Sequence, residues 1–196
     1  MKLKNIRFFL GLSIVCLSLD INAQEVVYKN IKINFSEEWK TQENAQKQFM
    51  AFSPNKDVLI LSLVYPPNID EGQKTLIAAQ DSIDKLEQII PNVQVVEKEK
   101  QIRSSKGMPL QFTQYSYQMK DETRFLIGAT IATNAGIALI TFDGKGDTNQ
   151  SLLKFKKIMD HFEFTKPQNG FLFTEKQNTT SLSHEGFPSF YEQGIL

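Results

Sequence analysis

The stretch Thr123–Phe142, TRFLIGATIATNAGIALITF, is the most apolar part of the sequence after its N-terminal leader. Beta-branched and aromatic residues dominate Arg124–Thr133 and Gly136–Phe142, and the Asn-Ala-Gly between them is typical of a bend. We therefore predict two antiparallel strands joined as a hairpin. Arg124 is the only charged residue in the stretch. This pair is expected to form the centre of the sheet, with any activity lying elsewhere.

The first 23 residues have the layout of a secretory signal peptide. Three basic residues within positions 2–7 precede an apolar run of 12 residues, Phe8–Leu19, and Ala23 supplies a small residue at the expected cleavage point. A transmembrane helix needs about 20 apolar residues, so the run is short for a span. The sequence therefore predicts export, and an uncleaved N-terminal anchor is the less favoured alternative.

Lipid attachment at Cys16 is also disfavoured, because Val15 before the cysteine is not small. Cleavage after residue 23 would leave 19 basic and 21 acidic side chains, a net charge of −2, and no cysteine. Such a charge gives no reason to expect nucleic acid as a partner. A cysteine-free exported chain fits a bacterial periplasmic or secreted protein better than a small disulfide-linked domain.

Apolar spacing predicts two helices packed on the sheet. In Thr75–Ile90 the residues Leu76, Ala79, Ile83, Leu86 and Ile90 recur at helical intervals, with Thr75 as a candidate cap and Pro91 as a stop. A second stripe runs through Gln150–Phe162, with Thr148 or Asn149 as its cap. Further strands are expected within Glu25–Phe35, Lys47–Ser53, Val58–Tyr65, Asn92–Gln101 and Leu110–Met119.

The segment Leu110–Met119 alternates between two faces. One face carries Gln111, Thr113, Tyr115 and Tyr117, which could bind a ligand. A solvated face of an antiparallel sheet has the same pattern, and we favour that interpretation.

Metal chemistry has little support in the sequence. His161 and His184 are the only histidines, and no ligand spacing joins them. A histidine at the end of a helix, as expected for His161, is explained by the helix dipole. The segment Asp143–Asp147, DGKGD, resembles a calcium loop, but Lys145 stands where an oxygen ligand is required. We interpret it as a turn and expect no metal and no cofactor.

Catalytic motifs are absent from the sequence as well. There is no G-x-S-x-G elbow, and neither histidine is placed beside a candidate nucleophile. The glycines near Lys145 do not complete a phosphate loop or a dinucleotide fingerprint. We therefore assign no catalytic residue and expect a protein that is not an enzyme.

The order of elements and several core motifs resemble the Mog1/PsbP-like family, including its exported bacterial members. The motifs are Ile33-Asn34-Phe35 with Trp39, the pair Phe49–Phe52 and Val58–Tyr65, the helix Thr75–Ile90, the hairpin, and the closing Phe155–Phe164, FKKIMDHFEF. The resemblance covers roughly residues 26–164. It implies an α+β fold in which an antiparallel sheet of about six strands is sandwiched between helices, and functions that are mostly non-enzymatic.

Three segments are therefore expected: a signal peptide at 1–23, the α+β domain at 24–166, and a tail at 167–196. The tail is polar yet holds Phe171, Phe173, Phe187, Phe190 and Tyr191, so it could dock on its own domain or bind a partner. We expect a non-catalytic monomer of the envelope that binds or helps assemble another protein. A carrier or sensor of a small apolar ligand, using Tyr115, Tyr117 and the tail, is the alternative.

Overall fold

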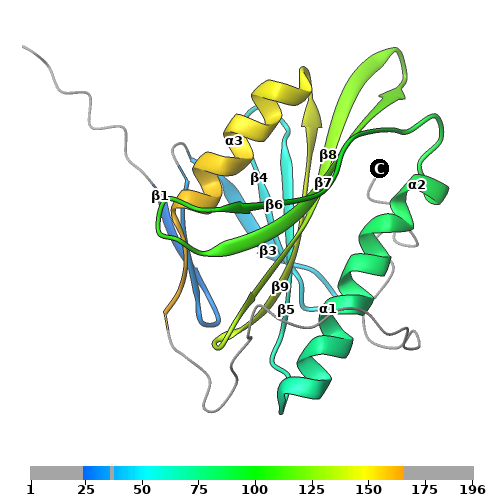
Figure 1. The fold of residues 1–196 in the computed structure, drawn as a ribbon. Coiled ribbons are helices and arrows are strands. Elements are labelled where there is room, and N and C mark those ends of the chain that lie inside the picture. The colour runs from blue at the N-terminus through cyan, green and yellow to red at the C-terminus, as the bar shows by residue number, and fades with distance from the viewer. Residues whose placement is uncertain (1–23, 36–37, 166–196) are drawn as a thin grey trace, which may run out of the picture.

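The chain folds as ten strands and three helices, seen in a computed structural model that describes residues 24–35 and 38–165 (Figure 1). The elements are β1 (Gln24–Tyr28), β2 (Ile31–Phe35), β3 (Lys40–Glu43), β4 (Phe49–Phe52), β5 (Val58–Val64), α1 (Ile69–Asp84), α2 (Leu86–Ile89), β6 (Gln94–Arg103), β7 (Pro109–Met119), β8 (Glu122–Thr133), β9 (Gly136–Lys145), α3 (Thr148–Asp160) and β10 (Phe162–Phe164). The expected α+β class is confirmed.

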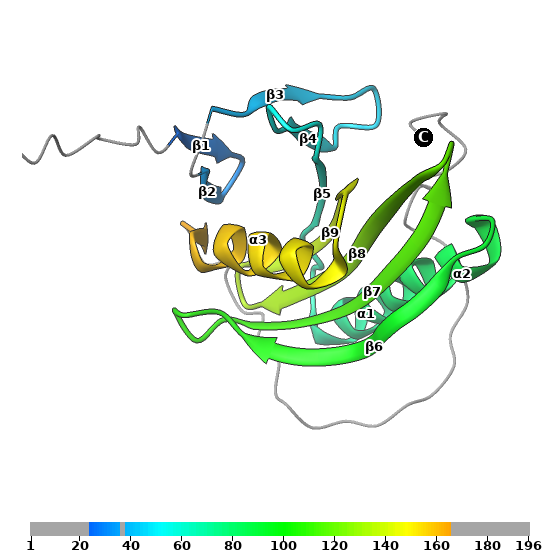
Figure 2. The ribbon, with the colours of Figure 1, turned by 90° about the horizontal axis from the view of Figure 1, so that it is seen from above.

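Seven strands form one antiparallel sheet in the order β3-β4-β5-β9-β8-β7-β6. The predicted hairpin is its central part: β8 and β9 pair from Arg124 with Lys145 to Thr133 with Gly136, around a two-residue turn. The strongly curved sheet has β3 and β4 at one end and β6 and β7 at the other (Figure 2). About six strands were expected. The prediction did not include β3, because its four residues are polar and exposed and carry no apolar alternation.

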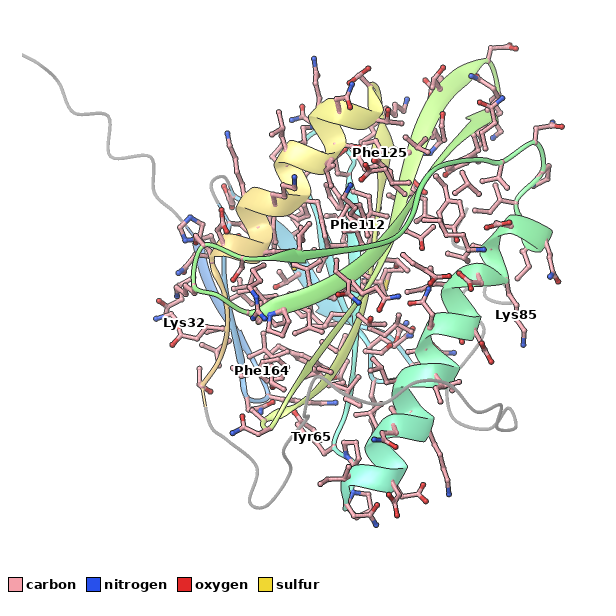
Figure 3. The ribbon with its side chains drawn as sticks, viewed as in Figure 1. Lys32, Tyr65, Lys85, Phe112, Phe125 and Phe164 are labelled. Atoms are coloured by element: carbon pink, nitrogen blue, oxygen red, sulfur yellow. The ribbon has the colours of Figure 1, made fainter. Side chains whose placement is uncertain are left out.

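One face of this sheet carries the larger core, which we call the α3-side core. Helix α3 packs there together with a small antiparallel sheet, β1-β2-β10. Phe112 and Phe125 of the large sheet lie below α3 (Figure 3). Trp39 stacks on Phe35 with ring centroids 4.5 Å apart. This tryptophan therefore packs within the α3-side core, where residues far apart in sequence share one apolar interior.

The opposite face carries the α1-side core, formed where α1 and α2 cover the sheet. Ala79, Ile83, Leu86 and Ile90 pack against Tyr115, Tyr117, Leu126 and Leu139. Helix α1 comes close to the sheet at Gly128, where an added Cβ would lie 2.9 Å from Cγ2 of Ile83. The large sheet thus lies between helices, as expected, and each face has a core of its own (Figure 1).

A polar junction centred on Asn30 helps to fasten the small sheet to the large one. Asn30, in the turn between β1 and β2, donates to the carbonyl of Ala135 at 3.0 Å and accepts from the Tyr65 hydroxyl at 2.5 Å. The backbone N–H of Thr165 donates to the carbonyl of Asn30 at 2.8 Å. The end of β5, the central hairpin and the residue after β10 therefore meet at one point, near the Tyr65 label in Figure 3.

Both long helices begin earlier than the sequence predicted. Helix α1 begins at Ile69, where Asn68 accepts from the backbone of Glu71 at 2.9 Å, and Thr75 lies within the helix instead of capping it. Helix α3 is capped by Asp147, not by Thr148 or Asn149. Polar first turns conceal a helix start when only apolar spacing is used.

The predicted leader at 1–23, the tail at 167–196 and His184 lie outside the described residues. Ser36 does as well, while Trp39 precedes strand β3 and belongs to no helix. Within residues 24–35 and 38–165, no helix is both long and apolar enough to cross a bilayer.

Candidate functional site

A buried charged cluster, formed by Tyr117, Arg124 and Asp143, lies on the α1 face of the sheet. The Tyr117 hydroxyl donates to Oδ2 of Asp143 at 2.6 Å. Arg124 donates from Nε to Oδ1 of Asp143 at 3.1 Å and to the Tyr117 oxygen at 3.0 Å, and Nη2 contacts the same carboxylate. We call these three residues the Asp143 cluster.

Three adjacent strands hold this cluster. Tyr117 of β7 stands opposite Arg124 of β8, and Asp143 of β9 stands opposite Leu126, one step along the same face. Because alternate residues of a strand share a face, the register places all three polar groups together. The side chains of Arg124 and Asp143 are 13% and 11% exposed, so their ion pair is largely withdrawn from water.

The electrostatics favour a structural role for the cluster. Burial raises the pKa of Asp143 above its ordinary value, while the hydrogen bonds from Tyr117 and Arg124 act in the opposite direction. Burial also raises the pKa of Tyr117, and the charge of Asp143 adds to this effect, so the phenol stays protonated and donates. Each of the three polar groups is already hydrogen-bonded to another member of the cluster. This arrangement suits a structural contact between strands better than a site that transfers protons.

A second buried carboxylate, Asp57, explains the glycine after Asp143. Asp57 is 2% exposed and accepts from Nζ of Lys154 at 3.1 Å. A Cβ on Gly144 would lie 2.2 Å from Oδ1 of Asp57. The segment predicted as a turn is thus strand β9 as far as Lys145, where a glycine admits a buried carboxylate. Only Gly146 and Asp147 of that segment form the connection to α3.

The tyrosine face predicted to be solvated is buried, and that expectation was wrong. Tyr115 is fully buried and donates to the carbonyl of Ile83 in α1 at 2.9 Å, while Thr113 accepts from the backbone of Glu99 at 3.2 Å. Polar residues line this face because each has a specific internal partner, not because water covers it. The face offers no open platform for the small ligand of the alternative hypothesis.

His161 is exposed and ends α3, where its backbone N–H donates to the carbonyls of Ile158 and Met159. Across the described part of the chain, no group of three or more His, Cys, Asp or Glu side chains could hold a metal ion. The structure therefore brings no metal-ligating set together in these residues.

An exposed apolar end of the sheet is the clearest surface feature. Ile89 of α2 is 44% exposed, and Val95 and Val96 at the start of β6 are 42% and 45% exposed. Strand β6 pairs with β7 on one side and is the last strand of the sheet on the other. The sequence predicted an edge strand here. It did not single out the two valines, which are exposed because α2 does not cover them.

No family model and no curated protein matches the chain. Solved structures do resemble it. Cyanobacterial PsbP (CyanoP) from Synechocystis sp. PCC 6803 has a TM-score of 0.48 and 12% identity, with 79% of this chain and 99% of that chain covered. That structure is a PsbP protein, from the family that the sequence resembles.

Two other structures are similar to the same extent. LpqN, described as involved in cell envelope biogenesis of Mycobacterium tuberculosis, has a TM-score of 0.45 and 15% identity, covering 71% of this chain and 82% of that one. A protein from Bacteroides thetaiotaomicron VPI-5482 has a TM-score of 0.46 and 12% identity over 74% of this chain. The match spans 49% of the Bacteroides chain, about half its length.

Proposed function

We propose that the protein is a non-catalytic, exported component of the cell envelope that binds another protein and helps to assemble or stabilise it. The observation that carries this proposal is a set of three exposed aliphatic side chains: Val95 and Val96 at the start of strand β6, and Ile89 at the end of α2, the helix that precedes it. The leader predicted at residues 1–23 supports the location in the envelope. We call Ile89, Val95 and Val96 the edge site.

A free edge strand can pair with an extended segment of another protein, which then adds a strand to the sheet. In β6, such pairing with another protein is restricted to the beginning of the strand. The pairing with β7 is irregular between Val95 and Glu97 and again between Glu97 and Lys100, and Glu99 adopts a φ of 51°. Bulges and a run of alternating charges both discourage strand addition. Gln94 and Val95 therefore remain as the regular, uncharged part of the edge, and Val96 follows them as an unpaired residue.

Side-chain contacts would add to this main-chain pairing. Val95 stands opposite Tyr115, so it lies on the face that α1 and α2 cover, and Ile89 is in the last turn of α2. A partner with an apolar side chain at this point would bury three half-exposed aliphatic groups. Each fully buried group of that size stabilises a contact by about 1.5–3 kcal/mol.

Site-directed photo-crosslinking of the full chain in its own cells tests the proposal. A photoreactive amino acid at position 96 should give an adduct with one recurrent envelope protein, identified by mass spectrometry. The same residue at position 153 is the matched control, because Leu153 is 60% exposed on α3, away from β6. The adduct should weaken at least tenfold when Val95→Lys is added.

Three outcomes would contradict the proposal. Equal adducts from positions 96 and 153 would mean that exposure alone governs the reaction. Adducts restricted to a second copy of the chain would make the edge a self-association surface. An adduct unaffected by Val95→Lys would show that the edge site does not bind the partner.

A further inference from the structure

The part of the α1 face that lies over β4 and β5 is apolar except at Ser62, which accepts from Nε2 of Gln48 at 2.8 Å. Register identifies the residues: Met50 stands opposite Ile60, which stands opposite Thr141, which stands opposite Gly128 beneath α1. The same face continues in Phe52, Val58 and Val64. We call Met50, Phe52, Val58, Ile60 and Val64 the β4–β5 patch.

This patch belongs to neither core. Its neighbours on the other side of the same strands, Phe49, Ala51, Leu59 and Leu61, are part of the α3-side core, and no residue of the patch is in either core. Among the described residues, α1 packs chiefly on β8 and β9, and α3 on β2, β7 and β8. The α1-side core therefore stops short of β4 and β5.

Two residues of the patch are nevertheless closed off from solvent. Met50 is 3% exposed and Ile60 is 9% exposed, while Phe52, Val58 and Val64 are half-buried. An apolar sheet face normally packs against another element, since burial of apolar area drives folding. A covering element is therefore needed on this face beyond α1.

We propose that residues 168–196 of the same chain dock on the β4–β5 patch. The point at which the described chain ends supports this occupant. Thr165 donates to Asn30, Asn30 accepts from Tyr65, and Tyr65 directly follows Val64 at one end of the patch. The tail thus leaves the domain beside the end of β5, where little chain is needed to reach the α1 face.

The length and composition of the tail fit this surface. The patch extends along the seven residues of β5, a distance of about 20 Å at strand geometry. The 31 residues after Thr165 could extend about 100 Å, so the tail can cross the patch and return. Its five aromatic side chains are apolar groups that could pack on the patch and cover it.

Cysteine crosslinking in a chain of residues 24–196, which lacks the predicted leader, tests the docking directly. The chain without its leader has no cysteine, so introduced thiols are the only reactive ones. Val58→Cys on the patch is combined with Leu172→Cys or Ser189→Cys in the tail, and a short bismaleimide is added. We expect an intramolecular adduct, at least tenfold above the matched pairs in which Leu153→Cys on α3 replaces Val58→Cys.

A second measurement uses Met50→Cys, with and without residues 168–196. Its rate of maleimide labelling should rise at least tenfold when the tail is removed, with the circular dichroism spectrum unchanged. Adducts that join two chains would instead identify a second copy as the occupant. Absence of an adduct with both tail cysteines, or labelling at one rate in both forms, would overturn the proposal.

The docking and the edge site are separable by experiment. Crosslinking from position 96 reports on a partner, whereas crosslinking from position 58 reports on the tail, and the two positions lie on strands at different ends of the large sheet. Failure of one test leaves the other result unchanged.

Discussion

The two faces of the seven-stranded sheet are built differently. In the described residues, the α3-side core joins 21 buried residues drawn from both sheets and α3, whereas the α1-side core joins eight. The α3 side holds eight aromatic rings in close contact with aliphatic groups, and the α1 side adds buried hydroxyls, an ion pair and a patch outside its core. The comparison indicates that one face holds the fold together and the other combines packing with specific polar contacts.

The most severe way to break this comparison is to place a carboxylate in each core. Ile127→Asp on the α3 side and Leu139→Asp on the α1 side should both unfold the domain, because both side chains are completely buried. An unpaired buried charge is expected to cost more than about 4 kcal/mol, a large part of the total stability of a domain. Circular dichroism and urea titration would measure this. A folded, stable Leu139→Asp protein would show that the α1-side core does not contribute to the stability of the domain.

A graded comparison uses one large-to-small change in each helix. Phe155→Ala in α3 should lower the free energy of unfolding by about 3–5 kcal/mol, and Ile83→Ala in α1 by about 2–4 kcal/mol. Both side chains are buried, and alanine suits both helices. Urea unfolding monitored by circular dichroism measures the difference. A larger loss of unfolding free energy for Ile83→Ala than for Phe155→Ala would mean that the α1 side contributes more to stability than the α3 side.

The close approach of α1 to the sheet can be tested at Gly128. Gly128→Ala should cost about 1–3 kcal/mol, because its Cβ would crowd Ile83. The double variant with Ile83→Ala should be more stable than the sum of the two single losses predicts, by about 0.5–3 kcal/mol. Simple additivity in a urea-based mutant cycle would mean that α1 moves away freely.

The smallest expected effect is a pH dependence specific to the α1 side. The pKa of Asp143 is raised in the folded protein above its reference value of 3.8, so the folded state holds that proton more tightly than the unfolded state. This contribution to stability is complete below pH 3.8 and is lost as the pH rises through the folded pKa. Relative to Asp143→Asn, the wild type should therefore lose stability as the pH rises above 3.8 and through the raised folded pKa.

Urea midpoints of both proteins at several pH values measure this difference. An increase of the wild-type advantage with pH would mean that Arg124 and Tyr117 outweigh burial at Asp143. Asp57→Asn provides a comparison on the opposite face, where the partner is the part-exposed Lys154.

The central hairpin and the α+β class of the fold could be predicted because their signals are local. Apolar alternation in β8 and β9, the bend at Asn134-Ala135 and the stripe from Ala79 to Ile90 all appear in consecutive residues. The start of α1 was missed for the same reason. Asp70, Glu71 and Gly72 carry no apolar stripe, and Asn68 is a cap whose role depends on backbone geometry.

The contacts between strands could not be read from the sequence. Arg124 stood out as the one charge in an apolar hairpin, which signals a buried partner, but its partner lies on β9 and is selected by register. The polarity of Tyr115 and Thr113 suggested water, whereas each bonds to a neighbouring element. Polar residues in a strand therefore indicate solvent only when no partner lies across the fold.

The three-stranded sheet has a consequence for when the protein can fold. Its middle strand, β2, comes near the start of the described chain, and β10, which pairs with it, comes last: Phe162 stands opposite Ile33 and Phe164 opposite Ile31. The α3-side core therefore cannot close until residue 164 has left the ribosome. Contacts of such sequence separation form late and slowly. While residues 24–163 are being made, the chain therefore has to exist without its completed α3-side core.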